Sequence, residues 1–234
     1  MEQERLNQLR RSLETAFINK NLSSNLEFKP QFISNNYKER HKIISFIEKE
    51  LLSCDEFFIS VAFITVGGIT PILQTLRELE RRNIKGKIIT TDYLKFSEPK
   101  ALCMLKNFSN IQLKMFITEN EREGFHTKGY IFKKGDIYTS IIGSSNMTLS
   151  AFTVNKEWNT KIISTENGEY TVALLCEFEN LWNSRRSLYI DDFIDTYTNI
   201  YNKNLIIKNK VIDSEEIDNS FIKSHILKPN SMQM

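Results

Sequence analysis

Residues 125–130 read Phe-His-Thr-Lys-Gly-Tyr, residues 141–146 read Ile-Ile-Gly-Ser-Ser-Asn, and a glutamate, Glu157, follows. Successive side chains of an extended strand point to opposite faces, so His126 and Lys128 share one face with Tyr130. The run from Tyr138 to Ile142 indicates the adjacent strand, and residues 143–146 indicate the turn that leaves it. That turn offers hydroxyl, amide and backbone N–H groups at a sheet edge. The two segments and the glutamate could therefore converge on one phosphate group.

This pattern resembles the active-site signature of the phospholipase D superfamily, which is written H-x-K, then G-S-x-N, then an acidic residue. The resemblance implies that His126 is a nucleophile that forms a phosphohistidine. It implies that Lys128, Ser144 and Asn146 bind the phosphate oxygens and that the Glu157 carboxylate orients the histidine. Ser145 is a further candidate for substrate binding, or it is only a turn residue.

Many members of the superfamily carry an aspartate five positions after the lysine, where this chain has Lys133. The difference favours the nuclease-like branch over the lipid-cleaving branch. The resemblance also implies an α/β fold, with a mixed, largely parallel sheet flanked by helices and one half-site per chain.

The order of the elements independently predicts an alternating α/β domain. Apolar residues at helical spacing predict helices within residues 1–20, 43–52, 72–79, 99–107 and 172–182, and a last amphipathic stretch over 191–201. Apolar runs predict strands at 57–64, 87–91, 111–117 and up to residue 164. Because a strand, a helix and a strand follow one another, parallel pairing is expected.

The polar stretch after the strand at 87–91 is a candidate substrate groove. In open α/β sheets, ligands bind beyond the carboxyl ends of the strands, which points to Thr91, Tyr93 and Lys95. The alternative is a plain loop.

Composition bounds the function classes. The longest apolar stretch, residues 57–66, is half the ~20 residues that a membrane span needs, and residues 1–5 lack the features of a signal peptide. We therefore expect a cytoplasmic protein without a membrane partner. Cys54, Cys103 and Cys176 are far apart in the sequence and have no nearby histidines, so we expect neither disulfides nor a metal site.

The formal net charge of +2 is too small to indicate nucleic-acid binding by itself, so any such contact requires a local basic cluster. Basic residues between Arg77 and Lys87 form one candidate, although they are interleaved with Glu78 and Glu80 and equally fit a solvated helix end.

Residues 206–234 lack periodicity and are predicted to be a linker, after a nuclease domain at 1–205. Lys228-Pro229-Asn230-Ser231-Met232-Gln233 is similar to the element that precedes the ATP-binding loop of superfamily-two helicases. Together with Thr91-Asp92-Tyr93-Leu94 and Asn155-Lys156-Glu157-Trp158-Asn159, this makes the chain resemble the phospholipase-D-like domain at the front of bacterial DEAD/DEAH-type helicases, over about residues 10 to 200. The resemblance implies fusion to an ATP-dependent helicase in restriction or phage defence, with ATP used only by that helicase.

The number of histidines implies a dimer. Cleavage through a phosphohistidine needs one group to attack and another to protonate the leaving oxygen. The chain has 3 histidines, and neither His41 nor His225 belongs to such a motif. We therefore expect a homodimer in which two copies of His126 form one composite site that needs no metal.

Three function classes follow from these patterns. The first is a metal-independent nuclease that acts on nucleic acid, most plausibly DNA. The alternatives are a phospholipase that acts on lipid and a non-catalytic DNA-binding module that loads a helicase.

Overall fold

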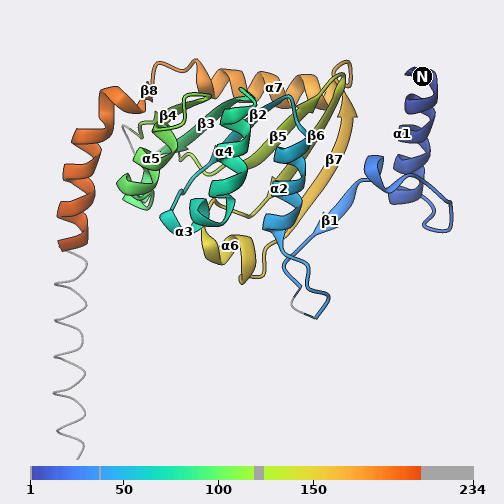
Figure 1. Cartoon of the computed structure of the whole chain (residues 1–234), viewed down its shortest axis with the longest axis horizontal. Helices are drawn as coiled ribbons and strands as arrows, with labels where there is room; N and C mark the ends of the chain where they lie inside the picture. Colours follow the sequence, from blue (N-terminus) through green and yellow to red (C-terminus); the bar gives the residue numbers. More distant parts are fainter. Residues whose placement is uncertain (1, 37, 119–123, 207–234) are drawn as a thin grey trace, which may run out of the picture.

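A single eight-stranded sheet forms the centre of the molecule. The computed structural model describes residues 2–36, 38–118 and 124–206. The sheet has the order β1-β7-β6-β5-β2-β3-β4-β8 (Figure 1). Its strands are β1 (Gln31–Ile33), β2 (Glu56–Val61), β3 (Lys85–Thr91), β4 (Ile111–Phe116), β5 (Lys128–Lys134), β6 (Ile137–Gly143), β7 (Asn159–Thr165) and β8 (Ser187–Tyr189).

The α/β class is confirmed, but the prediction of a largely parallel sheet is wrong. Only the pairs β2–β3 and β3–β4 are parallel, and the other neighbouring pairs in the described sheet are antiparallel. The length of the connection accounts for the β5–β6 pair. A parallel pair needs a crossover, such as the helix between β2 and β3, whereas β5 and β6 are joined by a tight turn at Gly135, whose φ is 59°.

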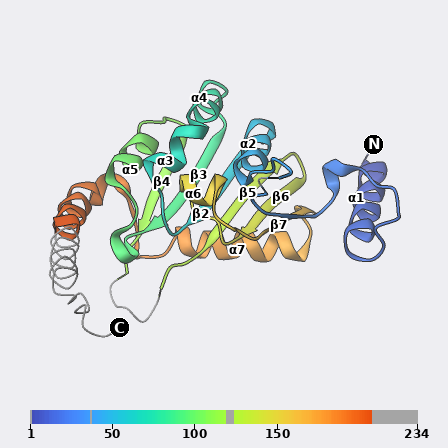
Figure 2. The ribbon, with the colours of Figure 1, turned by 90° about the horizontal axis from the view of Figure 1, so that it is seen from below.

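Helices cover both faces of the sheet. The first layer contains α2 (Ile43–Ser53), α3 (Val66–Ile69), α4 (Leu73–Arg81), α5 (Pro99–Lys106) and α6 (Leu149–Thr153), which share one core cluster with the sheet. The opposite face carries α7 (Glu169–Trp182), as Figure 2 shows. The apolar stripe of α2, with Ile43, Ile47 and Leu51, is fully buried, which is the usual source of helix stability in a globular protein.

Two further helices lie at the two ends of the sheet (Figure 1). Helix α1 (Glu2–Phe17) packs Leu9 against Phe28, Ile137 and Ile163. At the other end, a helix over residues 190–206 buries Tyr197, whose hydroxyl donates to the Ser97 carbonyl at 2.8 Å. The linker predicted for 206–234 and the helicase-like element lie outside the described residues, apart from residue 206.

The predicted helices and central strands are all present. The two strands that the sequence pattern missed, β1 and β8, are three-residue edge strands, too short to show a period. Strand β5 begins at Lys128, so His126 lies just before it. None of the helices in the described ranges has the length and apolar composition required to span a bilayer.

Gly68 allows α3 to press against the segment that follows β6. A Cβ at position 68 would lie 2.0 Å from the Met147 carbonyl oxygen, and the same carbonyl accepts a hydrogen bond from the Thr65 amide at 3.0 Å. Only glycine fits this approach.

We expect Gly68→Ala to lower the free energy of unfolding by about 2 kcal/mol or more, because the added methyl group meets backbone that cannot move aside. Urea denaturation followed by circular dichroism measures the change. Gly124→Ala is the control, since a Cβ there meets no atom within 4 Å. Equal stability of the two variants would contradict the close approach.

Candidate active site

His126 and Lys128 lie at the start of β5, held in place by β2. The Ala62 amide donates to the Thr127 carbonyl at 3.1 Å, and the hydroxyls of Ser60 and Thr127 are 2.5 Å apart. The Lys128 ammonium donates to the His126 carbonyl at 2.9 Å. The histidine is exposed and the lysine half-buried, so both are presented at the same edge of the sheet.

The turn after β6 is fastened to the segment that leads into β7. A Cβ on Gly143 would lie 2.1 Å from the Trp158 carbonyl oxygen, so this position requires glycine. The Ser144 amide donates to that carbonyl at 3.0 Å, and the Trp158 amide donates to Ser144 Oγ at 3.0 Å. The same hydroxyl donates to the Glu157 carboxylate. Ser144 therefore positions Glu157 directly.

Ser145 points into the protein. It is fully buried, its carbonyl accepts from the Tyr130 hydroxyl at 3.1 Å, and its Oγ accepts from Asn159 Nδ2 at 2.9 Å. The prediction that Ser145 binds substrate is wrong, because buried groups with satisfied hydrogen bonds cannot reach a ligand. Its burial and its hydrogen bonds are consistent with the alternative prediction, a structural residue of the turn.

Asn146 reaches across to the chain that leaves β2. Its Oδ1 accepts from the Phe63 amide at 3.1 Å, and the Met147 amide donates to the Phe63 carbonyl at 3.1 Å. The Phe63 ring meets the His126 ring edge-on, with centroids 6.2 Å apart. Phe63 thus joins Asn146 and His126, a role that the sequence pattern did not indicate because a backbone amide carries it.

The charges of the site act on one another. Burial lowers the pKa of His126, and the positive charge of Lys128 lowers it further. Burial also lowers the pKa of Lys128, whereas the Glu157 carboxylate raises it. Both effects favour the neutral form of the imidazole.

Glu157 contacts Ser144 Oγ and, at 3.5 Å, Asn155 Nδ2. Within the described part of the chain its negative charge acts on Lys128, and no hydrogen bond joins it to His126. Its predicted role in orienting the histidine stays a prediction.

Only some of the residues predicted to form a substrate groove after β3 are accessible to a ligand. Thr91 is fully buried, and its hydroxyl donates to the Phe116 carbonyl at 2.9 Å and accepts from the Tyr93 amide at 3.1 Å. The prediction that Thr91 binds substrate is therefore wrong. Tyr93 is partly exposed, and Lys95 forms an ion pair with Asp92 at 2.5 Å. Their predicted contact with substrate stays a prediction.

No group of three or more His, Cys, Asp or Glu side chains in the described ranges is placed to hold a metal ion. The chemical groups at this sheet edge are an imidazole, an ammonium, a carboxylate, a hydroxyl and an amide. Together they suit a reaction in which a nucleophile attacks an anionic centre whose charge the lysine and the amide stabilise.

We expect Lys128→Met to raise the pKa of His126, because removing the neighbouring positive charge makes the imidazolium form less costly. A titration of the imidazole by NMR measures the shift. Lys156→Met, which removes a charge that does not perturb His126, is the control. An unchanged or lower His126 pKa in Lys128→Met would show that the lysine does not act on the histidine.

Comparisons with known proteins identify the same region. Residues 49–182 match the family described as cardiolipin synthase, PLD-like domain. A search of curated protein sequences finds no match.

Solved structures share the fold. NucT from Helicobacter pylori is 18% identical, with 69% of this chain and 98% of that chain covered and a TM-score of 0.54. Nuc from Salmonella typhimurium, a phospholipase D family member, is 18% identical, with 69% and 99% covered and a TM-score of 0.51. The phosphatidylserine synthase of Haemophilus influenzae is 11% identical, with 85% and 51% covered and a TM-score of 0.51.

The family match spans more than half of the chain and contains the histidine, the lysine, the serine, the asparagine and the glutamate of the site. This protein belongs to the phospholipase D superfamily.

Proposed function

We propose that the protein is a metal-independent nuclease that cleaves nucleic acid, most plausibly DNA, through a covalent phosphohistidine. The observation that supports it most is the meeting of His126 and Asn146 at Phe63, with Lys128 and the Ser144–Glu157 pair at the same sheet edge. A phospholipase D fold with these groups is suited to phosphodiester cleavage.

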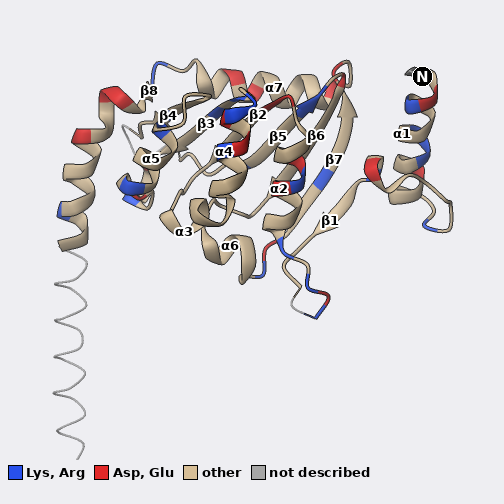
Figure 3. Ribbon diagram, in the orientation of Figure 1, with Lys and Arg blue, Asp and Glu red and all other residues tan. Residues whose placement is uncertain are grey.

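A basic groove favours a polyanionic substrate. A groove of about 760 Å³ is lined by Lys38, Arg40, His41 and Lys42 from the loop before α2, and by Thr153 at the end of α6. Figure 3 shows the basic residues of this loop between β1 and α2. Because β1 ends at Ile33 opposite Asn159 at the start of β7, the loop that follows β1 leaves the sheet at the same edge as the site. A polyanionic backbone bound at the site can continue over these basic residues.

Two residues of the basic cluster between Arg77 and Lys87 are already paired. Arg81 pairs with Glu78 at 2.7 Å, and Lys87 pairs with Glu179 at 2.6 Å on the α7 side of the sheet. Arg81 and Lys87 are thus engaged in separate ion pairs and do not form one binding surface.

The reaction needs two imidazoles. An imidazole nitrogen of neutral His126 bonds to phosphorus while the bond from phosphorus to the leaving oxygen breaks, and His126 of the partner subunit, which enters this step protonated, gives its proton to that oxygen. The partner's His126, now neutral, takes a proton from water, whose oxygen displaces the first histidine from phosphorus. Lys128 and the Asn146 amide stabilise the negative charge on the phosphoryl oxygens.

An exposed apolar surface beside the site supports the homodimer. Four side chains around the catalytic turn are largely exposed: Phe32 (65%), Leu149 (49%), Val154 (73%) and Trp158 (71%). The Phe32 and Trp158 rings meet edge-on with centroids 5.7 Å apart. Exposed apolar surface of this kind is typical of an interface, and a second copy seated here brings its own His126 to the same edge.

The biological setting follows from the sequence resemblance alone. Fusion to an ATP-dependent helicase, a role in restriction or phage defence, and a cytoplasmic location remain proposals. Reading the gene beyond codon 234 tests the fusion, since a stop codon with no Walker motif downstream excludes it.

We expect the wild type to cleave labelled DNA in excess EDTA and His126→Ala to lose about 10³-fold or more of the rate while it still binds DNA. Single- and double-stranded DNA, RNA and phosphatidylcholine are tested side by side, with His225→Ala as the matched histidine control. A requirement for added magnesium contradicts the mechanism. Choline release indicates a lipase, and DNA binding without cleavage by the wild type indicates a loading module.

We expect the activity of mixed dimers to follow the square of the wild-type fraction. An equal co-refolded mixture of wild type and His126→Ala should keep about a quarter of the activity, because only about one dimer in four has two intact histidines. A linear dependence would show that each chain acts alone.

A second prediction concerns the surface proposed as the dimer interface. Val154→Glu and Trp158→Glu should shift the protein to monomers in analytical ultracentrifugation and reduce cleavage with the loss of dimer. Val172→Glu, on an exposed position of α7, is the matched control. Dimers that persist in both Val154→Glu and Trp158→Glu would exclude this surface as the interface.

A further inference from the structure

A second candidate site lies away from the catalytic edge. A cavity of about 500 Å³ is enclosed by α1, the 3-10 helix η1 (Leu26–Phe28), α2 and the strands β5, β6 and β7. Strand β5 connects the two places, because Lys128 begins it and Lys134, which lines the cavity, ends it. The cavity and the active site are thus about 20 Å apart along the strand. The volume of the cavity lies within the range of small-molecule sites.

The inner wall of the cavity is apolar. Phe28, Phe132, Ile137 and Ile163 line it, and each is at least nine-tenths buried. They come from η1, β5, β6 and β7, so the wall depends on the N-terminal segment packing against the sheet. A flat apolar group can lie against this wall.

A buried ion pair occupies the same cavity. The Lys161 ammonium lies 2.6 Å from the Glu50 carboxylate, and their side chains are only 5% and 13% exposed. Lys161 is in the middle of β7, on the same sheet face as Ile163, where an apolar residue would avoid the cost of burying two charges. A pair retained at this cost, in a space large enough for a ligand, is suited to contact a polar molecule.

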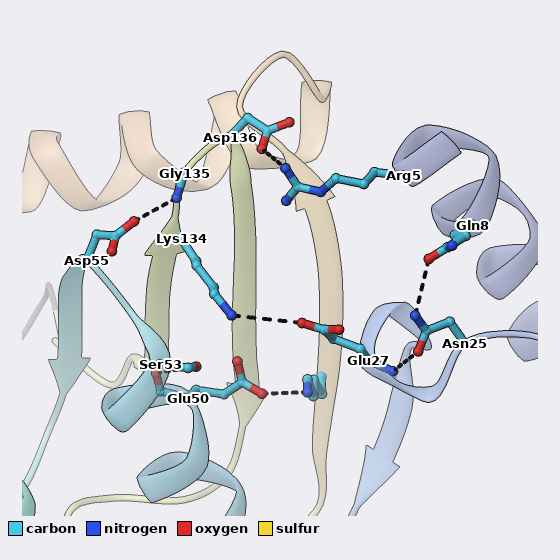
Figure 4. A network of polar contacts seen from close by, with 11 residues as sticks. Arg5, Gln8, Asn25, Glu27, Glu50, Ser53, Asp55, Lys134, Gly135 and Asp136 are labelled. Atoms are coloured by element: carbon cyan, nitrogen blue, oxygen red, sulfur yellow. Dashed lines mark hydrogen bonds and ion pairs between the residues drawn. The ribbon is translucent and has the colours of Figure 1, made fainter. Parts of the chain in front are cut away.

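The rim of the cavity is cationic. In Figure 4, Lys134 from β5 points toward Glu27, and Arg5 from α1 points toward Asp136. The separation of Lys134 from Glu27 is 3.9 Å with both side chains more than half exposed, so this pair is loose. Lys49, also on the rim, has no ion pair within the described residues. Two lysines are therefore available to an anion.

We propose that this cavity binds a nucleoside phosphate. The phosphate would contact Lys49 and Lys134 at the rim, and the base would lie against the apolar wall. The carboxylates of Glu27 and Glu50 can accept hydrogen bonds from sugar hydroxyls and base amino groups. A fatty acid has no such donors and would leave both carboxylates against its acyl chain, whereas inorganic phosphate alone would leave the apolar wall empty.

The test measures binding to the full chain carrying His126→Ala and Lys128→Ala, so that the catalytic edge contributes little. AMP, GMP, CMP and UMP are titrated by isothermal calorimetry, with adenosine and inorganic phosphate as partial ligands. We expect at least one nucleotide to bind about tenfold or more tightly than either partial ligand. In that background, Lys49→Glu with Lys134→Glu should weaken its binding by about tenfold or more.

Lys100→Glu with Lys203→Glu, two exposed lysines outside the cavity, is the charge-matched control and should bind as the background does. Thermal denaturation establishes that each variant is folded, which is expected because Lys49 and Lys134 are exposed. Absence of nucleotide binding, equal binding of inorganic phosphate, or binding that survives both glutamate substitutions would each overturn the proposal. None of these outcomes affects DNA cleavage by the wild type, so the cavity and the nuclease are tested separately.

Discussion

The hydrogen bonds between Ser144 and Trp158 are the contacts on which the site depends most. The Ser144 amide and hydroxyl engage the two backbone groups of Trp158, and Gly143 permits the approach. The pair joins the end of β6 to the start of β7, and it holds Glu157 against the same hydroxyl. Without it, the glutamate would lie in a different loop from the serine and the asparagine, with no contact between the two loops.

Three antiparallel strands carry this arrangement. Because β5, β6 and β7 alternate in direction, the start of β5, the end of β6 and the start of β7 lie at one edge of the sheet. Residues that are far apart in the chain are thereby brought together on a rigid scaffold, which is what a preorganised site requires. The opposite ends of the same strands line the cavity beneath α1.

The two edges differ in their electrostatics. At the candidate catalytic edge, burial and the Lys128 charge lower the pKa of His126, while exposed apolar side chains surround the turn. At the cavity, cations surround an apolar wall and a buried ion pair. The catalytic edge thus combines a half-buried cation with exposed apolar surface, whereas the cavity combines exposed lysines with an apolar wall.

Much of the fold and site was predictable from the sequence. The amphipathic period of α2, the apolar run of β2 and the spacing of His126, Lys128, Ser144, Asn146 and Glu157 are local properties of the chain. Phe125 and Tyr130, which alternation assigns to opposite faces, lie in different core clusters. The superfamily could be recognised because its chemistry requires these residue types at this spacing.

Only the tertiary structure decided the rest. It showed that most strand pairs are antiparallel, that Thr91 and Ser145 are buried, and that Phe63 joins Asn146 to His126 through its backbone amide and its ring. Strand direction, burial and backbone contacts depend on which segments meet across the sheet. Periodicity and motif spacing describe one segment of the chain at a time. The sequence alone therefore determined which residues are candidates for catalysis, and the folding of distant segments decided which groups surround them.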